Sequence, residues 1–366
     1  MVKLEKISLR AAQRVIAISD VHGNLAYLRG LMNKLHLRST DTLLFLGDLL
    51  EKGPDSLGVL RECMALREKC RVYFLQGNTD AWHLQPQLTA QQREYWHRNY
   101  FRRLQSGGEP GFLVQLCRAC GISEGSGCDP DYLIDVLDEA RVPEREFLRS
   151  LPQIIESEDY TFVHGGLPKE GARLSAAEPW DCMKYDSFAA SGRKFDKWVI
   201  CGHTPVMLYR RDITCANPII DENTHIVSID GGCVLKDDGQ LNALILENGR
   251  FSFEYYDPFP VCMALDAQAE SESSFYIAWG DNRVELLSEK NGVCRIRHLR
   301  TGREMDVPAD FLSLRDGELI TNDCTDYRPA IVPGELVSLV RQTECGAWIK
   351  KNGVSGWYDG CLQFVE

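Results

Sequence analysis

Short apolar runs recur along the first two thirds of the chain. They are rich in Val, Ile and Leu and end at Gly, Asp, Asn or His, which is typical of buried β-strands bounded by turns. The predicted strands are Arg14–Ser19, Thr42–Leu46, Arg71–Leu75, Tyr160–Val163, Lys197–Cys201, His225–Ile229 and Leu241–Leu246.

Segments with helical periodicity lie between the first three predicted strands. Between Leu25 and Leu35, apolar side chains recur at the spacing of one helix face. Pro54 marks the start of a second helix, since Pro is favoured in the first turn. The alternation of strand and helix implies parallel pairing, and it predicts an α/β core in a first domain at residues 1–257.

Other segments depart from this alternation. Residues 81–157 have few β-branched runs and are predicted to form a mainly helical insertion. Residues 258–273 are a predicted linker. Beyond it, residues 283–307 and 335–360 share a pattern of strand, turn, strand, Gly turn and strand. We therefore expect one or two small all-β barrels in residues 274–366.

The balance of charged residues excludes some classes of function. The 366 residues include 41 Lys and Arg against 53 Asp and Glu, a formal net charge of −12. This acidic excess argues against a protein that coats nucleic acid or an anionic membrane. No apolar run approaches the roughly 18 residues needed to span a bilayer, and the N-terminal stretch lacks the features of a signal peptide. We therefore expect a cytoplasmic protein whose 14 cysteines are mostly buried thiols.

Side chains of the kinds that bind metal ions follow five of the predicted strands. They are Asp20, His22, Asp48, Asn78, His164 and His203. Any one of them alone would be interpreted as a turn or cap residue, but strand ends in an open α/β sheet converge on one crevice. Their mixture of donors suits two divalent or trivalent ions, manganese first and iron or zinc as alternatives. Asp48 has two oxygens and can bridge both ions. Two ions about 3.5–4 Å apart can hold a hydroxide for in-line attack on phosphorus.

The same stretches resemble a known family. SDVHGN, GDLLEKGPDS, QGNTD, FVHGG and ICGHTP are similar to the signature of the calcineurin-like metallophosphoesterase superfamily. The likeness is strongest to its phosphoprotein phosphatase branch, which includes bacterial Ser/Thr phosphatases, lambda phosphatase and dinucleoside tetraphosphate hydrolases. The resemblance covers residues 14–250 and implies a four-layer β-sandwich flanked by helices. Near the C-terminus, GVSGWYDG resembles the end of bacterial SH3-like domains.

The resemblance also implies roles for individual residues. It implies that the first ion is bound by Asp20, His22 and Asp48, and the second by Asp48, Asn78, His164 and His203. It implies catalytic roles for Lys52, Asp48 and His203, and phosphate binding by Lys52, Asn78 and Lys184. It also implies that Glu51, Asp80 and Asp230 lie behind the ligands and support them. A surface lysine at Lys184 and a strand-end turn at Asp230 remain as alternatives.

Three positions depart from the branch. Where it reads G-D-x-x-D-R-G, this chain has Glu51 and Lys52, so the cation keeps its charge but loses the bidentate fork of Arg. Where the branch has a His after G-N, this chain has Thr79, which cannot act as a general acid near neutral pH. We expect slow turnover of alkyl phosphates or a preference for good leaving groups. His83 is either a replacement acid or a surface or helix histidine.

These features support three alternative functions. The first is a dimetal-dependent phosphomonoesterase acting on a phosphoprotein or a small phosphate ester. The second is a hydrolase of dinucleoside polyphosphates or related phosphoanhydrides. The third is a metal-binding scaffold with weak catalysis. Four aromatic residues of the C-terminal region either are exposed and bind a peptide or protein partner, or fill the barrel cores: Trp279, Trp348, Trp357 and Tyr358.

Overall fold

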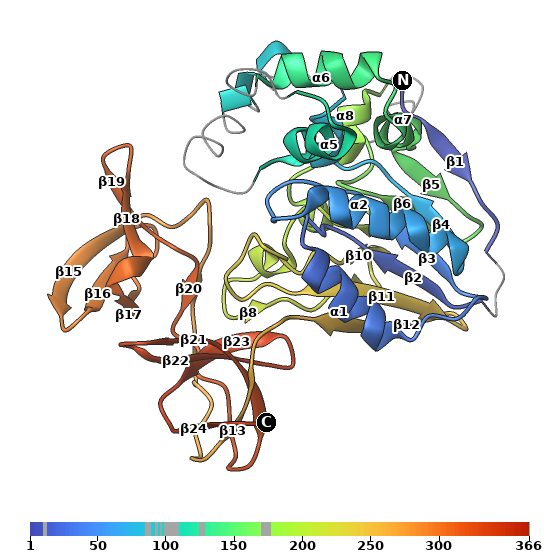
Figure 1. The fold of residues 1–366 in the computed structure, drawn as a ribbon. Coiled ribbons are helices and arrows are strands. Elements are labelled where there is room, and N and C mark those ends of the chain that lie inside the picture. The colour runs from blue at the N-terminus through green and yellow to red at the C-terminus, as the bar shows by residue number, and fades with distance from the viewer. Residues whose placement is uncertain are drawn as a thin grey trace. The chain divides into compact units, whose positions relative to one another are not determined.

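The computed structural model describes residues 1–9, 13–84, 89–91, 94–95, 97–98, 110–123, 129–169 and 177–365. The chain divides into two compact units (Figure 1). Unit 1 comprises Met1–Pro205, Pro218–Leu235 and Gln240–Asp257. Unit 2 comprises Val206–Asn217, Lys236–Gly239 and Pro258–Glu366. Two inner segments that we assigned to the first domain therefore belong to unit 2.

Two β-sheets form the frame of unit 1. The five-stranded sheet has the order β12-β11-β2-β3-β4, and β2, β3 and β4 run parallel as predicted. The six-stranded sheet has the order β1-β5-β6-β7-β10-β9. The bounds are β1 Leu4–Lys6, β2 Val15–Ile18, β3 Thr42–Phe45, β4 Arg71–Phe74, β5 Ile154–Glu156, β6 Tyr160–Val163, β7 Trp198–Cys201, β9 Ile219–Asp221, β10 Ile226–Ser228, β11 Leu241–Glu247 and β12 Arg250–Tyr256.

Alternate residues of the strands face two different cores. In β2, Val15 and Ala17 belong to a buried cluster that also contains Phe162 of the six-stranded sheet. Ile16 and Ile18 belong to a second cluster, shared with the helices. This period of two is what a strand buried on both faces requires, and it shows that the two sheets pack face to face.

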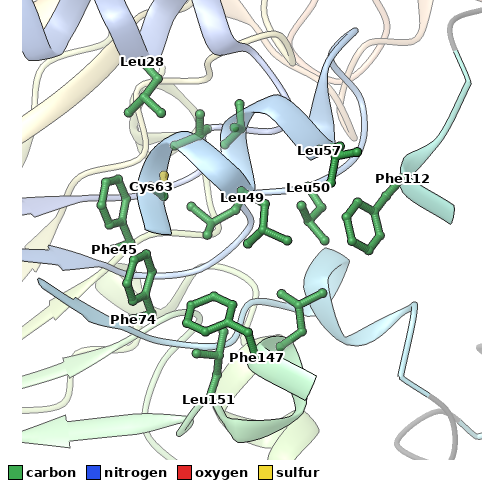
Figure 2. Packing of buried hydrophobic residues seen from close by; sticks show 14 of the residues in the cluster. Leu28, Phe45, Leu49, Leu50, Leu57, Cys63, Phe74, Phe112, Phe147 and Leu151 are labelled. Carbon is green, nitrogen blue, oxygen red and sulfur yellow. The ribbon is translucent and has the colours of Figure 1, made fainter. Parts of the chain in front are cut away.

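Helices cover the outer faces of both sheets. The five-stranded sheet packs against α1 (Leu25–Leu35), α2 (Ser56–Ala65), α5 (Phe112–Cys120), α6 (Pro130–Glu139) and α7 (Pro143–Ser150). Figure 2 shows Phe45 and Phe74 side by side, with ring centres 5.3 Å apart, and Phe147 of α7 edge-on to Phe74. Next to the six-stranded sheet, α8 (Pro179–Met183) and η3 (Phe188–Ala190) bury Cys182 and Phe188. The predicted sandwich flanked by helices is confirmed.

The predicted strands are all present, but the predicted insertion is wrong at its end. Within residues 81–157, α5, α6 and α7 are helical, whereas β5 is a strand paired with β1 and β6. A three-residue strand is too short for its periodicity to be recognised. Part of the insertion lies outside the described residues. The shorter helical elements of the chain are η1 (Leu66–Glu68), α3 (Asn78–Ala81), η4 (Val206–Tyr209) and η5 (Ala309–Phe311).

Unit 2 contains two three-stranded antiparallel meanders, as the paired sequence pattern predicts. The first is β15 (Val284–Lys290), β16 (Val293–His298) and β17 (Glu304–Pro308). The second, β21 (Leu336–Thr343), β22 (Gly346–Lys351) and β23 (Val354–Tyr358), lies in a sheet of order β24-β13-β21-β22-β23-β8. The other strands of this sheet are β8 (Thr214–Cys215), β13 (Val261–Ala264) and β24 (Leu362–Phe364). Two small two-stranded sheets pair β14 (Tyr276–Ile277) with β20 (Cys324–Thr325), and β18 (Leu312–Arg315) with β19 (Glu318–Thr321).

The structure corrects two expectations about the C-terminal region. The predicted linker at 258–273 contains β13, which pairs with β21 and β24; the prolines before β13 made it look like a turn. Trp348, Trp357 and Tyr358 are buried, so they fill a core and present no partner surface. Of the four aromatic residues, Trp279 is the one that is exposed, at 67%. In the described part of the chain, no helix is long and apolar enough to cross a membrane.

Candidate metal centre

Two groups of side chains meet beyond the ends of β2, β3, β6 and β7. In the first group, one ligand atom each of Asp20, His22 and Asp48 lies within 4.8 Å of the others. In the second group, Asp48, His164 and His203 satisfy the same condition. Asp48 belongs to both groups, as expected of a residue that bridges two ions.

The distances leave room for an ion in each group. His22 Nε2 lies 3.7 Å from Asp20 Oδ1 and 3.7 Å from Asp48 Oδ2. His164 Nε2 lies 3.4 Å from Asp48 Oδ1 and 3.2 Å from Oδ1 of Asn78, the first residue of α3. Ligand atoms that each stand about 2.1 Å from one ion are themselves roughly 3–3.5 Å apart. The carboxylate, imidazole and amide donors therefore fit Mn, Fe or Zn ions.

A backbone contact orients His164. Its Nδ1 lies 2.8 Å from the carbonyl oxygen of Leu46. Because a carbonyl oxygen only accepts, Nδ1 carries the hydrogen, and Nε2 faces Asp48 and Asn78 as the ligand atom.

The centre is rich in buried negative charge. Asp20, Asp48, Asp80 and Asp230 are each at most 2% exposed. Burial alone lowers the pKa of His164, but the charges of Asp48 and Asp20 outweigh burial and raise that pKa to about 10. Within the described residues, Asp20 Oδ1 and Asp230 Oδ2 are buried without a hydrogen-bond partner. Such oxygens are costly to leave unpaired, so the site needs positive charge of the kind that two metal ions supply.

Four of the ligand residues have a left-handed backbone. The φ angle is 59° at Asp20, 50° at His22, 51° at Asp48 and 67° at His203. This conformation costs roughly 1–2 kcal/mol for a residue with a Cβ atom. Cross-strand bonds hold it, since Asp20 N–H donates to Gly47 O (3.1 Å) and His22 N–H donates to Asp48 O (2.9 Å). Strain gathered at ligand positions indicates a functional site.

Two glycines allow the ligand loops to approach one another. A Cβ atom at Gly202 would lie 1.9 Å from Ser19 Oγ and 2.3 Å from Asp20 Oδ2. A Cβ atom at Gly77 would lie 2.2 Å from Asp48 Oδ1. Both positions therefore exclude any larger side chain unless a ligand moves.

Asp80 fixes the loop that carries Asp48. Its carboxylate accepts the backbone N–H groups of Asp48 (2.9 Å), Leu49 (3.0 Å), Leu50 (3.3 Å) and Gly77 (3.0 Å). Burial, followed by the charge of Asp48, raises its pKa to about 7. This geometry agrees with the supporting role that we expect for Asp80.

Asp230 follows β10 and lies behind Asp20. Its Oδ1 accepts the N–H of Gly232 at 2.8 Å. Burial raises the pKa of Asp230, and the nearby charge of Asp20 raises it further. Asp230 is thus a turn residue beside a predicted ligand, and its supporting role stays a prediction.

The position of the usual proton donor holds no acid. The Thr79 hydroxyl is buried and donates to Leu50 O at 3.1 Å. His83 is fully buried, with Nε2 3.3 Å from Glu51 Oε1. A ring with no exposed surface has no contact with a substrate, so the structure does not support His83 as a replacement acid, and His83 is neither a surface residue nor part of a helix. Glu51 also accepts the N–H of Phe112 at 2.8 Å, so it supports the start of α5; its predicted position behind the ligands stays a prediction.

Lys52 lies at the edge of the first ligand group. Its side chain is exposed, and Nζ lies 5.1 Å from the centre of the Trp82 ring. Burial lowers the pKa of His22, the charges of Asp48 and Asp20 raise it, and the charge of Lys52 lowers it.

Asp186 is a neighbour of the centre that sequence reasoning missed. Its Oδ1 lies 2.9 Å from His203 Nε2 and 3.4 Å from Lys184 Nζ. Lys184 is therefore linked through Asp186 to His203, which belongs to the second ligand group. Asp186 follows a short helix in a stretch with no recognisable motif, so no signal in the sequence marks it.

Solved structures of low sequence identity resemble this chain weakly. A metallophosphoesterase from Sphaerobacter thermophilus is 17% identical, with 67% of this chain and 89% of that chain covered and a TM-score of 0.37. A protein serine/threonine phosphatase from Saccharomyces cerevisiae is 13% identical, with 70% and 83% covered and a TM-score of 0.41. Likenesses this weak carry no argument about activity. The curated proteins include no significant match.

The family comparison is the informative one. The model of the family described as calcineurin-like phosphoesterase matches residues 13–207, more than half of the chain. That range contains all six predicted ligands, which the structure brings together as two groups that share Asp48. The chain belongs to the calcineurin-like phosphoesterase family of metal-dependent enzymes.

Proposed function

We propose that the protein is a dimetal phosphomonoesterase that hydrolyses a phosphorylated protein or a small phosphate ester. The observation that carries the proposal is the meeting of two ligand groups at Asp48. Asp20 and His22 would hold the first ion, and Asn78, His164 and His203 the second, with manganese as the proposed metal. When bound, two such ions polarise a phosphoryl oxygen and lower the pKa of a water molecule.

Two lysines are the proposed phosphate-binding residues. The charge of Lys52 acts on His22, and Lys184 Nζ lies 3.4 Å from Asp186, which contacts His203. An ammonium group acts as a point charge and lacks the planar fork of Arg. We therefore expect both lysines to attract a phosphate without fixing its rotation, and the ligand residues to determine its orientation.

The lack of a proton donor at position 79 determines which leaving groups we propose for the substrate. Neither the Thr79 hydroxyl, which is bonded to a carbonyl group, nor the enclosed His83 ring can protonate a departing oxygen. General acid catalysis contributes about 10²–10⁴-fold. An alkoxide would need that help, whereas an aryl oxide leaves without it, so the geometry favours aryl phosphates over alkyl phosphates.

The same observation supports a second candidate. A phosphate chain is also a leaving group that needs no proton, so buried Thr79 equally favours a phosphoanhydride hydrolase acting on dinucleoside polyphosphates.

A substrate panel separates the two candidates. Purified full-length protein with manganese is tested on phosphopeptides, an aryl phosphate, an alkyl phosphate and a dinucleoside tetraphosphate, with Asp48→Asn as the matched control. Release of phosphate from the aryl ester and phosphopeptides, but not from the tetraphosphate, supports the monoesterase. The reverse pattern supports the second candidate. Wild-type rates equal to those of Asp48→Asn on every substrate would contradict both and favour the scaffold.

A further inference from the structure

Each of the three histidines at the metal centre has a second contact at its ring. In His164 and His22, Nδ1 lies near a backbone carbonyl oxygen, at 2.8 and 3.4 Å respectively. His203 differs, because its Nε2 lies 2.9 Å from a side-chain oxygen, Oδ1 of Asp186. A backbone carbonyl remains after any substitution, whereas a carboxylate can be removed. The support of His203 can therefore be tested by mutation.

The contact with Asp186 determines which nitrogen of His203 is available to an ion. An ionised carboxylate only accepts hydrogen bonds, so Nε2 carries the hydrogen and donates it to Asp186. Nδ1 is then the nitrogen with a free lone pair, which a metal ligand needs. One ligand atom of His203 lies within 4.8 Å of those of Asp48 and His164, so His203 belongs to the second ligand group with its other nitrogen already bonded.

The backbone that carries Asp186 is anchored to the loop that follows His164. The carbonyl oxygen of Cys182, in α8, accepts the N–H of Gly165 at 2.8 Å. A Cβ atom at Gly165 would lie 2.8 Å from the carbonyl oxygen of Met183. The absence of a side chain at this glycine therefore allows the end of α8 to lie against the first ligand loop.

A second contact anchors the same backbone to the loop of His203. The N–H of Ser187 donates to Thr204 Oγ1 at 3.1 Å, which joins the residue after Asp186 to the residue after His203. The next residue, Phe188, is fully buried in the apolar cluster that includes β7, the strand leading to His203. The Asp186 side chain is 73% exposed, but its backbone is thus bonded to both ligand loops.

The backbone of His203 does not by itself orient the ring. Its N–H donates to Asp20 Oδ2 at 3.0 Å, yet the imidazole can still rotate about its two side-chain torsions. The hydrogen bond from Nε2 to Asp186 opposes that rotation. Lys184 Nζ lies 3.4 Å from the same carboxylate oxygen, so a cation helps to hold the carboxylate in place.

We infer that Asp186 is a positioning residue for the second ion, because it holds the imidazole of His203 with Nε2 bonded and Nδ1 available to the metal. The inference rests on the proposed metal centre and adds to it a residue that is not itself a ligand. It predicts that an exposed carboxylate alters the affinity for one ion of the pair.

The test measures manganese binding to full-length, metal-free protein. Asp186→Ala removes the acceptor, whereas Asp186→Asn removes the charge but keeps an oxygen that can accept from Nε2. Asp196→Ala is the matched control, because Asp196 is an exposed acid in the same connection between α8 and β7. Calorimetric titration gives the two affinities, electron paramagnetic resonance detects coupling between paired manganese ions, and the melting temperature of the metal-free proteins reports on folding.

We expect Asp186→Ala to bind the second ion roughly ten-fold more weakly, at the lower end of the loss seen when groups behind metal ligands are removed. Excess manganese should restore the coupled signal, and Asp186→Asn should lose less affinity than Asp186→Ala. The first ion should bind as in the wild type, the metal-free melting temperatures should be unchanged, and Asp196→Ala should match the wild type throughout.

Four results would contradict these expectations in different ways. Unchanged affinities in Asp186→Ala would overturn the inference, and so would an equal loss in Asp196→Ala, since the effect would then be one of net charge. A second ion that excess manganese does not restore in either Asp186 variant would make Asp186 a ligand, which also overturns the positioning role. A wild-type protein that binds fewer than two ions would overturn the metal centre itself, and the inference with it.

Discussion

Substitution of Gly77 by Ala tests the geometry of the centre with a single methyl group. Gly77 has an extended backbone, with φ −93° and ψ 173°, which Ala adopts without strain. The added Cβ atom would lie 2.2 Å from both the amide nitrogen and Oδ1 of Asp48, whereas ordinary contacts begin at 3.4 Å. Asp48 and the start of α3 must therefore separate by about 1 Å, several times the tolerance of about 0.2 Å for a metal ligand.

The expected result is loss of metal with limited loss of stability. A shift of 1 Å at a catalytic position costs about 10²-fold in rate, and overpacking costs about 1–3 kcal/mol of stability. We therefore expect Gly77→Ala to retain fewer than two ions by elemental analysis, and kcat on an aryl phosphate to fall by about 10²-fold or more.

A second glycine supplies the control for this substitution. Gly192 has a φ of 71° and no atom within 4 Å of an added Cβ, so Gly192→Ala introduces backbone strain of about 1 kcal/mol and no clash. We expect its metal content and kcat to match the wild type. A Gly77→Ala protein with two ions and wild-type kcat would refute the proposed role of Asp48 as the shared ligand.

Three further predictions concern single side chains. His164→Ala and His203→Ala should each lose one ion by elemental analysis; two ions retained in both would contradict the ligand assignment. Thr79→Val should keep kcat on an aryl phosphate within about two-fold, because the hydroxyl is not a proton donor; a loss of 10²-fold would show that it is one. Asp41→Asn should lower the unfolding free energy by about 3 kcal/mol at pH 7 in urea titrations, since it breaks a buried pair with Arg14. Burial raises the pKa of Asp41, but its bonds to Arg14 lower it overall, so the stabilisation is present above about pH 4 and should fade below it; a gap independent of pH would contradict this.

The catalytic unit was largely predictable because its signals are local. A buried parallel strand must be apolar throughout, and the turn that follows it must be polar, so runs such as Thr42–Leu46 reveal both the strand and its ligand. His164 follows β6 of the other sheet and reaches Asp48 because the two sheets pack face to face. Asp20 and Asp48 meet because β2 and β3 are neighbours in one sheet. This much follows from the amino-acid pattern and the sheet rule alone.

The features that could not be predicted depend on partners distant in the chain. Strand β8 has two residues and exists only because β23, some 140 residues later, pairs with it. His83 looked like a helix-surface residue because nothing nearby in the sequence shows that Glu51 and Phe112 enclose it. The left-handed backbone of Asp20, Asp48 and His203 is equally invisible, since no residue type at these positions demands it.

The two changes at Glu51 and Thr79 explain one another. In the branch that the chain resembles, the acid at the first position supports a proton-donating His at the second. Here the second position offers only a hydroxyl bonded to a backbone carbonyl, and the imidazole beside the Glu51 carboxylate is the buried ring of His83, 3.3 Å away. Glu51 also accepts the first N–H of α5, where the partial positive charge of a helix start favours an anion. Glu51 therefore supports the start of α5 and contacts a buried ring, and with a bonded hydroxyl at position 79 we expect a leaving group that departs without a proton.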